Sequence, residues 1–409
     1  MRAAIILPTV VLLSFLVSCT RNPGGTNMKS ASHDLNKYRV ELDTLRKKTS
    51  VAPALPHVPF FQFGMGNRTK LLYKNGVLID ALKGDTIKKW NVKEEIIVPY
   101  NYMVHLVTTN NEKITIREDS IAVWIHSKWE KEKVSGTTSK IRLPQFEDYR
   151  YPRIMKVLHH EILMNIVDSK PLPNFFVYKK PWRRDAAMMA MVLEHTGNLH
   201  LIKDWVLGLD DPYDRNNAGE TEADNLGETL YLISLFANRN NPLVLKIMEE
   251  AKKYEVKDGY SKYIKGRTDF HEVPVYQTKW LKFGIKRLGM EDEYTIPFME
   301  DNYSALFWWD FRSYYKPGIK DACDKVDYPY LGWACDHFHG DFNSPVSNHD
   351  YPLTWEKNAS QANYNGMAVI DPVFTSEKLA VPHSWHAAEM FLYLREKPRI
   401  KYQMTNKYL

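Results

Sequence analysis

The sequence predicts a mainly α-helical protein, a ring of inner helices wrapped by outer helices, preceded by a small antiparallel β domain. Residues 58–142 show the alternation of β-strands, whereas residues from 150 onward show helical periodicity. In the second part, strongly apolar segments alternate with amphipathic ones and are joined by very short turns, an arrangement typical of antiparallel helical hairpins. Because apolar helices need cover on all sides, this layout favours inner helices enclosed by outer ones.

Composition is that of a globular protein. The 409 residues are 44% hydrophobic and 25% charged, and the chain is long enough for more than one domain. The net charge is +6, and no basic block resembles a nucleic-acid-binding stripe, so a nucleic-acid partner is not expected. The 11 Trp and 24 Tyr fit a large core, which composition alone favours, and rings that stack on sugars are the alternative.

The N-terminus has the features of an export signal. Arg2 precedes an apolar run over residues 3–17, which is followed by Ser18 and Cys19. The run is too short for a membrane-spanning helix.

The segment Leu16-Val17-Ser18-Cys19 resembles the bacterial lipobox. The resemblance implies a signal peptide over 1–18, lipidation of Cys19 and a tether over 19–57. The protein is then expected as an exported lipoprotein on the periplasmic or cell-surface side of the bacterial outer membrane, with the lipid anchor as its only membrane contact. The alternative is an ordinary secretory signal with an incidental cysteine.

The β domain is expected over residues 58–142. Its strand-like segments are rich in Val, Ile, Thr and Tyr, with turn signals at Asn75-Gly76 and Asn110-Asn111. The segments are "TKLLYKNGVLID", "EIIVPYNYMVHLVTT" and "KITIREDSIAVWIHSKW".

The helical domain is expected over residues 150–409, without interrupting strands. Residues 186–193 are apolar all the way round, which indicates a buried helix ended by Gly197. Several apolar helices begin with polar and aromatic clusters. If the inner helices are parallel, these clusters meet at one end of the ring, where helix N-termini favour carboxylates and oxygen ligands. The clusters are Trp182-Arg183-Arg184-Asp185, residues 220–225, residues 269–272, Asp301-Asn302-Tyr303, Thr354-Trp355-Glu356 and His383-Ser384-Trp385-His386.

A simpler explanation exists for each acid at a helix start. Asp185, Asp224 and Asp301 have the residue type and position of plain N-caps or first-turn acids. Capping does not explain why tryptophans, Trp182 and Trp385, stand at equivalent places near the starts of two apolar helices.

Three of these segments resemble the six-hairpin glycosidase superfamily. "WRRDAAM" is similar to the Trp-x-Arg-Asp segment of glucoamylase-type enzymes, "EADNLGETLYLI" to their Gln-x-Asp-x-x-Gly-Glu segment, and "PHSWHAAEMFLYL" to the closing Trp-x-x-Ala-Glu helix. The resemblance implies an (α/α)6 toroid that acts on carbohydrate at the inner-helix N-termini. It implies that Arg184 and Asp185 bind sugar hydroxyls, and it maps the acids of the second motif to Asp224 and Glu228. Glu222 replaces the usual Gln, and the general-acid segment has no clear match.

Glycoside hydrolysis usually requires two carboxyl groups, a proton donor and a base or nucleophile. Inversion is the outcome that the resemblance implies. We predict Glu272 as the acid and Glu222 or Asp224 as the base. Glu356 and Glu389 are further candidates, and a structural salt bridge is the alternative for Glu389.

Substrate contacts are expected from aromatic, basic and acidic side chains at the helix starts. They are Trp182, Arg183, Arg184, Asp185, Glu228, Tyr303, Trp355, His383, Trp385 and His386. The expected partner is an oligo- or polysaccharide, with uronic acids as one option because arginine binds carboxylates bidentately.

Two other functions stay open. One is a polysaccharide lyase that uses Tyr or His as the base, with His337, His339, Tyr303 and Tyr364 available. The other is a glycan-binding lipoprotein without catalysis.

No cofactor and no metal are predicted. His337, His339 and Asp341 offer a metal site as the alternative to a polar loop. Cys323 and Cys335 can form a disulfide or remain thiols.

Overall fold

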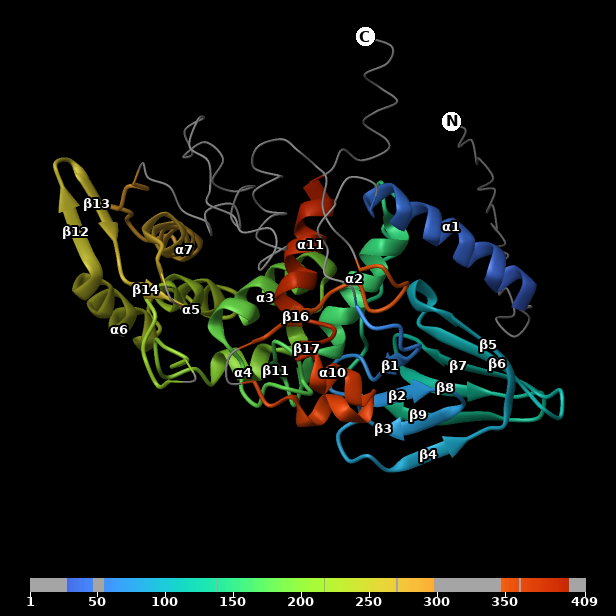
Figure 1. Ribbon diagram of the computed structural model, residues 1–409. Coiled ribbons are helices and arrows are strands. Elements are labelled where there is room, and N and C mark those ends of the chain that lie inside the picture. The colour runs from blue at the N-terminus through green and yellow to red at the C-terminus, as the bar shows by residue number, and fades with distance from the viewer. Residues whose placement is uncertain are drawn as a thin grey trace, which may run out of the picture.

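The structure is mixed α/β, and the predicted (α/α)6 toroid of twelve helices is wrong. Two antiparallel sheets of four and five strands lie beside a stack of helices (Figure 1). The computed structural model describes residues 28–46, 55–137, 139–216, 218–269, 271–297, 347–359 and 362–396.

Both sheets are simple meanders in which each strand pairs with the next. Asn75 and Gly76 have φ values of 47° and 77° and form the two-residue turn between paired Lys74 and Val77, as the Asn-Gly signal predicts. The four-stranded sheet contains β1 (Phe61–Phe63), β2 (Leu71–Lys74), β3 (Val77–Asp80) and β4 (Thr86–Lys89). The five-stranded sheet contains β5 (Val92–Val98), β6 (Met103–Thr108), β7 (Lys113–Glu118), β8 (Ala122–His126) and β9 (Lys131–Gly136).

The longer helices pack in the spatial order α2, α11, α3, α5 and α7, so segments far apart in sequence become neighbours (Figure 1). The helices are α1 (Met28–Arg46), α2 (Pro152–Met164), α3 (Arg183–Thr196), α4 (Lys203–Leu207), α5 (Asp224–Ser234), α6 (Pro242–Ala251), α7 (Pro274–Arg287), α10 (Pro372–Ser376) and α11 (Ser384–Glu396).

Helices α5 and α7 approach closely because two glycines face the contact. A Cβ atom on Gly227 would lie 2.2 Å from the carbonyl carbon of Trp280, and one on Gly284 would lie 2.5 Å from Cβ of Leu230. Because these two positions carry no side chain, the helices can pack this closely. Their close packing positions the start of α5.

The helical part also contains short antiparallel strands, contrary to the expectation of none. The signal in the sequence is Gly259-Tyr260, a two-residue hairpin turn with glycine first, between paired Asp258 and Ser261. Residues 356–357, expected in a helix, are also in a strand, and a 3-10 helix occupies Tyr364–Val369. The strand pairs are β10 (Ile166–Val167) with β11 (Lys170–Pro171), β12 (Glu255–Asp258) with β13 (Ser261–Ile264), β14 (Arg267–Thr268) with β15 (His271–Glu272), and β16 (Glu356–Lys357) with β17 (Leu379–Ala380).

The toroid prediction failed because apolar periodicity does not specify the packing partner. Residues 186–193 of α3 are all buried, as expected of a helix that is apolar on every side. Within the described ranges, their cover comes from neighbouring helices such as α11 and α5, and no second ring of long helices surrounds them. Helices α4 and α10 have only five residues each, too short to wrap an inner ring.

The segment expected as a tether contains a packed helix. In α1, Tyr38 and Leu42 are fully buried, and Arg39 makes an ion pair with Asp350 at 2.7 Å. The buried residues of α1 recur at intervals of three and four, which is the helical signal in this otherwise polar segment.

The predicted signal peptide and Cys19 lie outside the described residues. In the described part of the chain, no helix combines the length and hydropathy needed to span a membrane.

Candidate functional site

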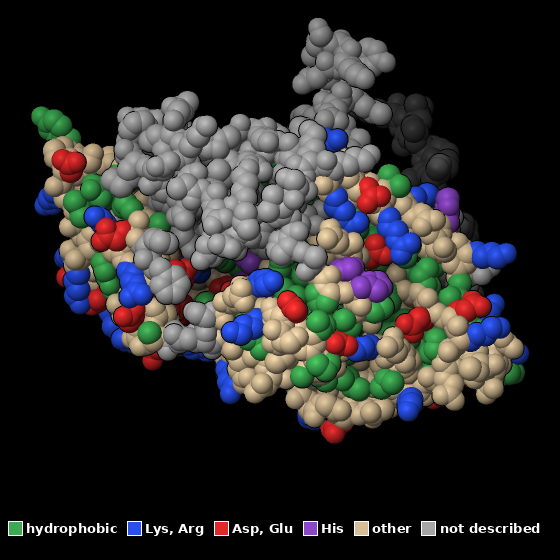
Figure 2. Space-filling model, in the orientation of Figure 1, with side chains coloured by type: hydrophobic (Ala, Val, Ile, Leu, Met, Phe, Trp, Pro, Cys, Tyr) green, Lys and Arg blue, Asp and Glu red, His purple; other side chains and the backbone are tan. Residues whose placement is uncertain are grey.

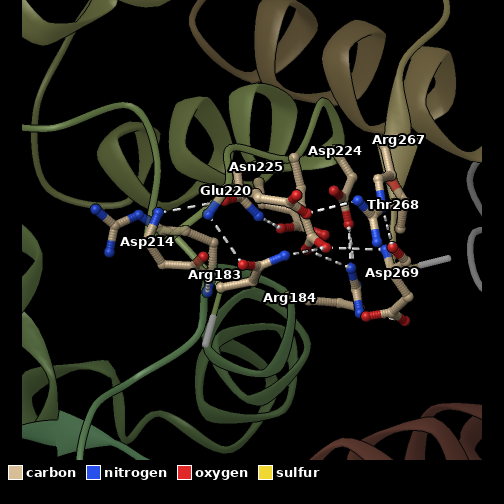
Figure 3. Close-up of polar contacts among 12 residues, drawn as sticks. Arg183, Arg184, Asp214, Glu220, Asp224, Asn225, Arg267, Thr268 and Asp269 are labelled. Atoms are coloured by element: carbon tan, nitrogen blue, oxygen red, sulfur yellow. Dashed lines mark hydrogen bonds and ion pairs between the residues drawn. The ribbon is translucent and has the colours of Figure 1, made fainter. Parts of the chain in front are cut away.

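Three helix starts meet in the structure, although they do not belong to a toroid. Trp182 precedes the first residue of α3, Asp224 begins α5, and Trp385 is the second residue of α11. Arg184, in the first turn of α3, contacts Asp224 of α5 and Trp385 of α11, and Figure 3 shows its ion pairs with Asp224 and Asp269.

One guanidinium group is bound by three carboxylates. Arg184 Nε and Nη2 each lie 2.9 Å from Asp224 Oδ2, Nη2 lies 3.2 Å from Glu222 Oε2, and Nη1 lies 2.8 Å from Asp269 Oδ2. The side chains of Arg184, Asp224 and Glu222 are buried, while that of Asp269 is 34% exposed. The ring of Trp385 lies 5.8 Å from the Arg184 guanidinium carbon, within cation–π range. We call these five residues the Arg184 cluster.

The Arg184 cluster contains more negative than positive groups. Burial raises the pKa of Glu222 to about 7, and the charges of Asp224 and Asp269 add to this rise despite the attraction of Arg184. Part of the Glu222 population is therefore protonated at neutral pH, so the carboxyl group can donate a proton.

A second polar network adjoins the Arg184 cluster through Asp185, the next residue of α3. His383 Nε2 lies 2.7 Å from Glu356 Oε2 and 3.9 Å from Asp185 Oδ1. The Tyr178 hydroxyl donates to the same Glu356 oxygen at 2.6 Å. Glu356 is 25% exposed, whereas Asp185 and His383 are buried. This network places an accessible carboxylate next to a buried one.

The pKa values of Asp185 and His383 are both raised, which favours a neutral aspartic acid and a charged histidine. Burial raises the pKa of Asp185 to about 7, which favours its neutral form. Burial alone would lower the pKa of His383, but the negative charge and hydrogen bond of Glu356 raise it overall. His383 is thus stabilised as a cation between two acids.

Other residues at the start of α11 have defined roles. His386 Nδ1 hydrogen-bonds to the backbone carbonyl of Trp355, and burial together with the charge of His383 lowers the His386 pKa, so this ring is neutral. Trp355 is itself buried, which leaves half-buried Trp182 and Trp385 as possible stacking rings.

Arg183 is directed away from the cluster although it is adjacent to Arg184. Its Nε donates to Thr229 Oγ1 at 3.1 Å, its Nη2 donates to the Asp211 carbonyl at 3.0 Å, and it packs against Trp205. Its expected contact with substrate is therefore not supported by the geometry.

Glu228 is also an interior residue. It is fully buried and accepts hydrogen bonds from Asn225 and Tyr276 at 3.2 Å. Burial raises its pKa well above the usual value. These contacts assign Glu228 to the packing of α5 against α7.

Glu272, the predicted acid, does not join the Arg184 cluster. Its side chain is 60% exposed and pairs with Lys265 at 2.7 Å. Asp269, which has a φ of 50° in the turn between β14 and β15, contributes the carboxylate instead. The signal that could have identified Asp269 is an aspartate between two short strand-like pairs, since aspartate tolerates this conformation.

The expected salt bridge of Glu389 is absent from the described part of the structure. Its side chain is buried, and neither carboxyl oxygen has a hydrogen-bond partner there. Burial raises its pKa well above the usual value, which keeps the group neutral.

Several predicted residues lie outside the described residues and receive no structural account. They are Cys19, Asp301, Tyr303, Cys323, Cys335, His337, His339 and Asp341.

Buried polar atoms without partners occur on residues of both networks. Among the described residues, Asp185 Oδ1, Asp224 Oδ1 and His383 Nδ1 have no hydrogen bond. An unsatisfied buried group costs about 1–3 kcal/mol, which a ligand hydroxyl or a water can offset. Within the described ranges, no group of three or more His, Cys, Asp or Glu side chains is arranged to hold a metal ion.

No family model, curated protein or solved structure matches this chain. The resemblance of the three motifs to six-hairpin glycosidases therefore stays a prediction. The (α/α)6 fold that the resemblance implied is not the fold of this structure.

Proposed function

We propose that the protein is a glycoside hydrolase whose site is formed by the Arg184 cluster and the adjoining Glu356 network. The observation that carries the proposal is the surplus of carboxyl groups around Arg184, one of which has a pKa of about 7, beside the accessible carboxylate of Glu356. Acid/base cleavage of a glycosidic bond requires a protonated and an ionised carboxyl group in one site.

Glu222 is the proton donor in this proposal, in place of Glu272. It would transfer its proton to the glycosidic oxygen as the bond from that oxygen to the anomeric carbon breaks. Asp224 is fully buried and bound by Arg184, and we therefore assign it to positioning rather than to the chemistry.

Glu356 is the carboxylate that would take a proton from water as the water oxygen attacks the anomeric carbon. Two donors, the Tyr178 hydroxyl and His383 Nε2, orient its Oε2 atom. Its partial exposure gives water access, which fully buried Asp224 does not have.

The sugar would be held by stacking and by hydroxyl contacts. The half-buried ring of Trp385 offers an apolar face beside the carboxylates. The partly exposed carboxylate of Asp269 is an acceptor suited to a sugar hydroxyl donor.

A uronic-acid substrate, and with it the lyase alternative, has less support. Arg184 is already bound by three carboxylates, and the Arg183 guanidinium donates to Thr229 and the Asp211 backbone. A substrate carboxylate would enter a site with surplus negative charge. Burial and the charge of Glu356 also raise the pKa of Tyr364, which makes its phenol a poor base at neutral pH.

The test is to incubate the protein with a panel of neutral and uronate-containing glycans. Hydrolysis is measured as the release of reducing ends. We expect Glu222→Gln and Glu356→Gln to lower the rate about 10²–10⁴-fold, the usual contribution of a positioned acid or base. Glu272→Gln is the matched control, because its exposed ion pair lies outside the site, and it should retain wild-type activity.

Other outcomes would reject hydrolysis. Products that absorb in the ultraviolet as unsaturated sugars would indicate a lyase. Binding of a glycan with no turnover by the wild-type protein would indicate a binding protein. Equal losses of activity in Glu222→Gln and Glu272→Gln would remove Glu222 as the acid.

A further inference from the structure

Two histidines from distant parts of the chain face each other on the surface. The Nδ1 atoms of His57 and His349 lie 3.4 Å apart, although the residues are separated by 292 positions in sequence. Their ring centroids are 5.2 Å apart with the planes tilted by 43°, so the rings meet through nitrogen atoms rather than by stacking.

A backbone carbonyl orients one of the two rings. His349 Nε2 lies 2.8 Å from the Leu55 carbonyl oxygen, which can only accept a hydrogen bond. In the neutral imidazole, the single proton is therefore on Nε2, and the lone pair of Nδ1 points toward His57. Carbonyl oxygens commonly orient metal-ligating histidines in this way.

The separation of the two nitrogens suits a shared metal ion better than a direct hydrogen bond. Hydrogen bonds from N–H groups usually measure about 2.7–3.2 Å between heavy atoms. Two nitrogens bound to a tetrahedral ion at about 2.0–2.1 Å are about 3.3–3.4 Å apart. The observed 3.4 Å agrees with the second geometry.

The surrounding charges are compatible with an added cation, because the nearest described arginines have acidic partners. Arg46 pairs with Asp43 at 3.3 Å while donating to the His349 carbonyl, and Arg39 pairs with Asp350 at 2.7 Å. His57 is exposed and His349 half-buried, so water can complete the coordination.

We propose that His57 and His349 form a surface site for a divalent transition-metal ion of the Zn²⁺, Ni²⁺ and Cu²⁺ class. Imidazole nitrogen suits these ions, whereas Mg²⁺ and Ca²⁺ prefer oxygen ligands. The bound ion would link the segment that precedes β1 to residues 347–350, which hold α1 through Tyr38, Arg39 and Arg46.

The test is titration of CuCl₂, ZnCl₂ and CaCl₂ into the purified full chain by calorimetry. We expect Cu²⁺ to bind more tightly than Zn²⁺, and Ca²⁺ not to bind at this site. His57→Asn and His349→Asn should each weaken Cu²⁺ binding at least tenfold. His200→Asn replaces an exposed histidine elsewhere and should leave the affinity unchanged.

Wild-type affinity in both His57→Asn and His349→Asn would overturn the proposal, as would an equal loss in His200→Asn. If a variant does not fold, the wild-type Cu²⁺ complex still decides the question by electron paramagnetic resonance. Nitrogen couplings from two imidazoles would support the site, and their absence would refute it.

Discussion

Two buried arginines of this molecule have opposite charge environments. Arg68, between β1 and β2, pairs with Glu118 of β7 at 2.7 Å, and both side chains are fully buried. Glu118 also accepts hydrogen bonds from the backbone N–H groups of Gly64 and Met65. Buried Lys70 lies in the same place, and burial lowers its pKa to about 7, so the acid here is not in excess, and the Arg68–Glu118 pair joins the two sheets without access to solvent.

Arg184 is surrounded instead by three carboxylates, and one of them is partly exposed. Unsatisfied atoms do not distinguish the two places, because Arg68 Nε and Nη2 also lack partners among the described residues. The two places differ in the balance of acidic and basic groups and in the access of solvent to the carboxylates. Balanced charge without access is typical of a structural ion pair, whereas surplus acid with access favours a site that acts on a ligand. On the face shown in Figure 2, basic and acidic side chains are interspersed over the described surface.

The largest effect on stability is expected from breaking the balanced pair. Arg68→Met leaves the Glu118 carboxylate buried without its cation and should lower the unfolding free energy by about 3–5 kcal/mol, measured by urea denaturation at pH 7. Lys88→Met is the control, because its ion pair with Glu132 is half-exposed and contributes at most about 1 kcal/mol. A loss for Arg68→Met as small as that of the control would contradict a structural role for the pair.

A smaller loss should follow from filling the contact that positions the start of α5. In Gly227→Ala, the added Cβ would overlap the backbone of Trp280, and the helices must separate. Overpacking of this kind costs about 1–3 kcal/mol. Gly208→Ala is the control, because its φ is −85° and an added Cβ there would meet no atom closer than 3.4 Å. Equal stability of Gly227→Ala and the wild type would show that α7 does not fix α5.

A further loss is expected in ligand binding when the stacking ring is removed. Trp385→Ala should weaken glycan binding about tenfold, measured by calorimetry with a ligand found in the hydrolysis panel, and Trp385→Phe should weaken it less. Trp129 is 80% exposed in the turn between β8 and β9, far from α11 in sequence, and Trp129→Ala is the control. Equal effects of the two alanine variants would remove Trp385 from the site.

Sequence reasoning succeeded where the signal is local. The Asn75-Gly76 turn follows from dipeptide chemistry, and the buried α3 follows from its apolar residues. The polar starts of buried helices also predicted that Arg184, Asp224 and His383 need partners, and the structure gives each of them a charged one, while their roles stay a prediction.

Sequence reasoning failed where the outcome depends on long-range packing. Whether buried helices form a ring or a stack depends on contacts between segments that periodicity does not encode. The prediction named Glu272, whereas the structure places Asp269 beside Arg184, and the cause is similar. A turn between two-residue strands decides which carboxylate faces Arg184.

The burial of Glu222 and Asp185, together with the negative charges near them, makes a direct prediction about pH. Glu222 and Asp185 have a pKa of about 7 in the folded protein, compared with about 4.3 and 3.9 in an unfolded chain. The folded state therefore binds these protons more tightly. Their contribution to stability is present below about pH 4 and is lost as the pH rises to about 7.

The decisive measurement is the unfolding free energy of the wild type and of the double variant Glu222→Gln/Asp185→Asn at pH 5 and pH 8. Other buried groups, such as Glu161 and His159, also titrate, but their effects cancel when the two proteins are compared. We expect the wild type to lose about 3–5 kcal/mol more than the double variant between pH 5 and pH 8, because each group loses about 1.4 kcal/mol per pH unit over roughly two units. The same change in both proteins would contradict the claim that the Arg184 cluster and its neighbour Asp185 hold acid in excess.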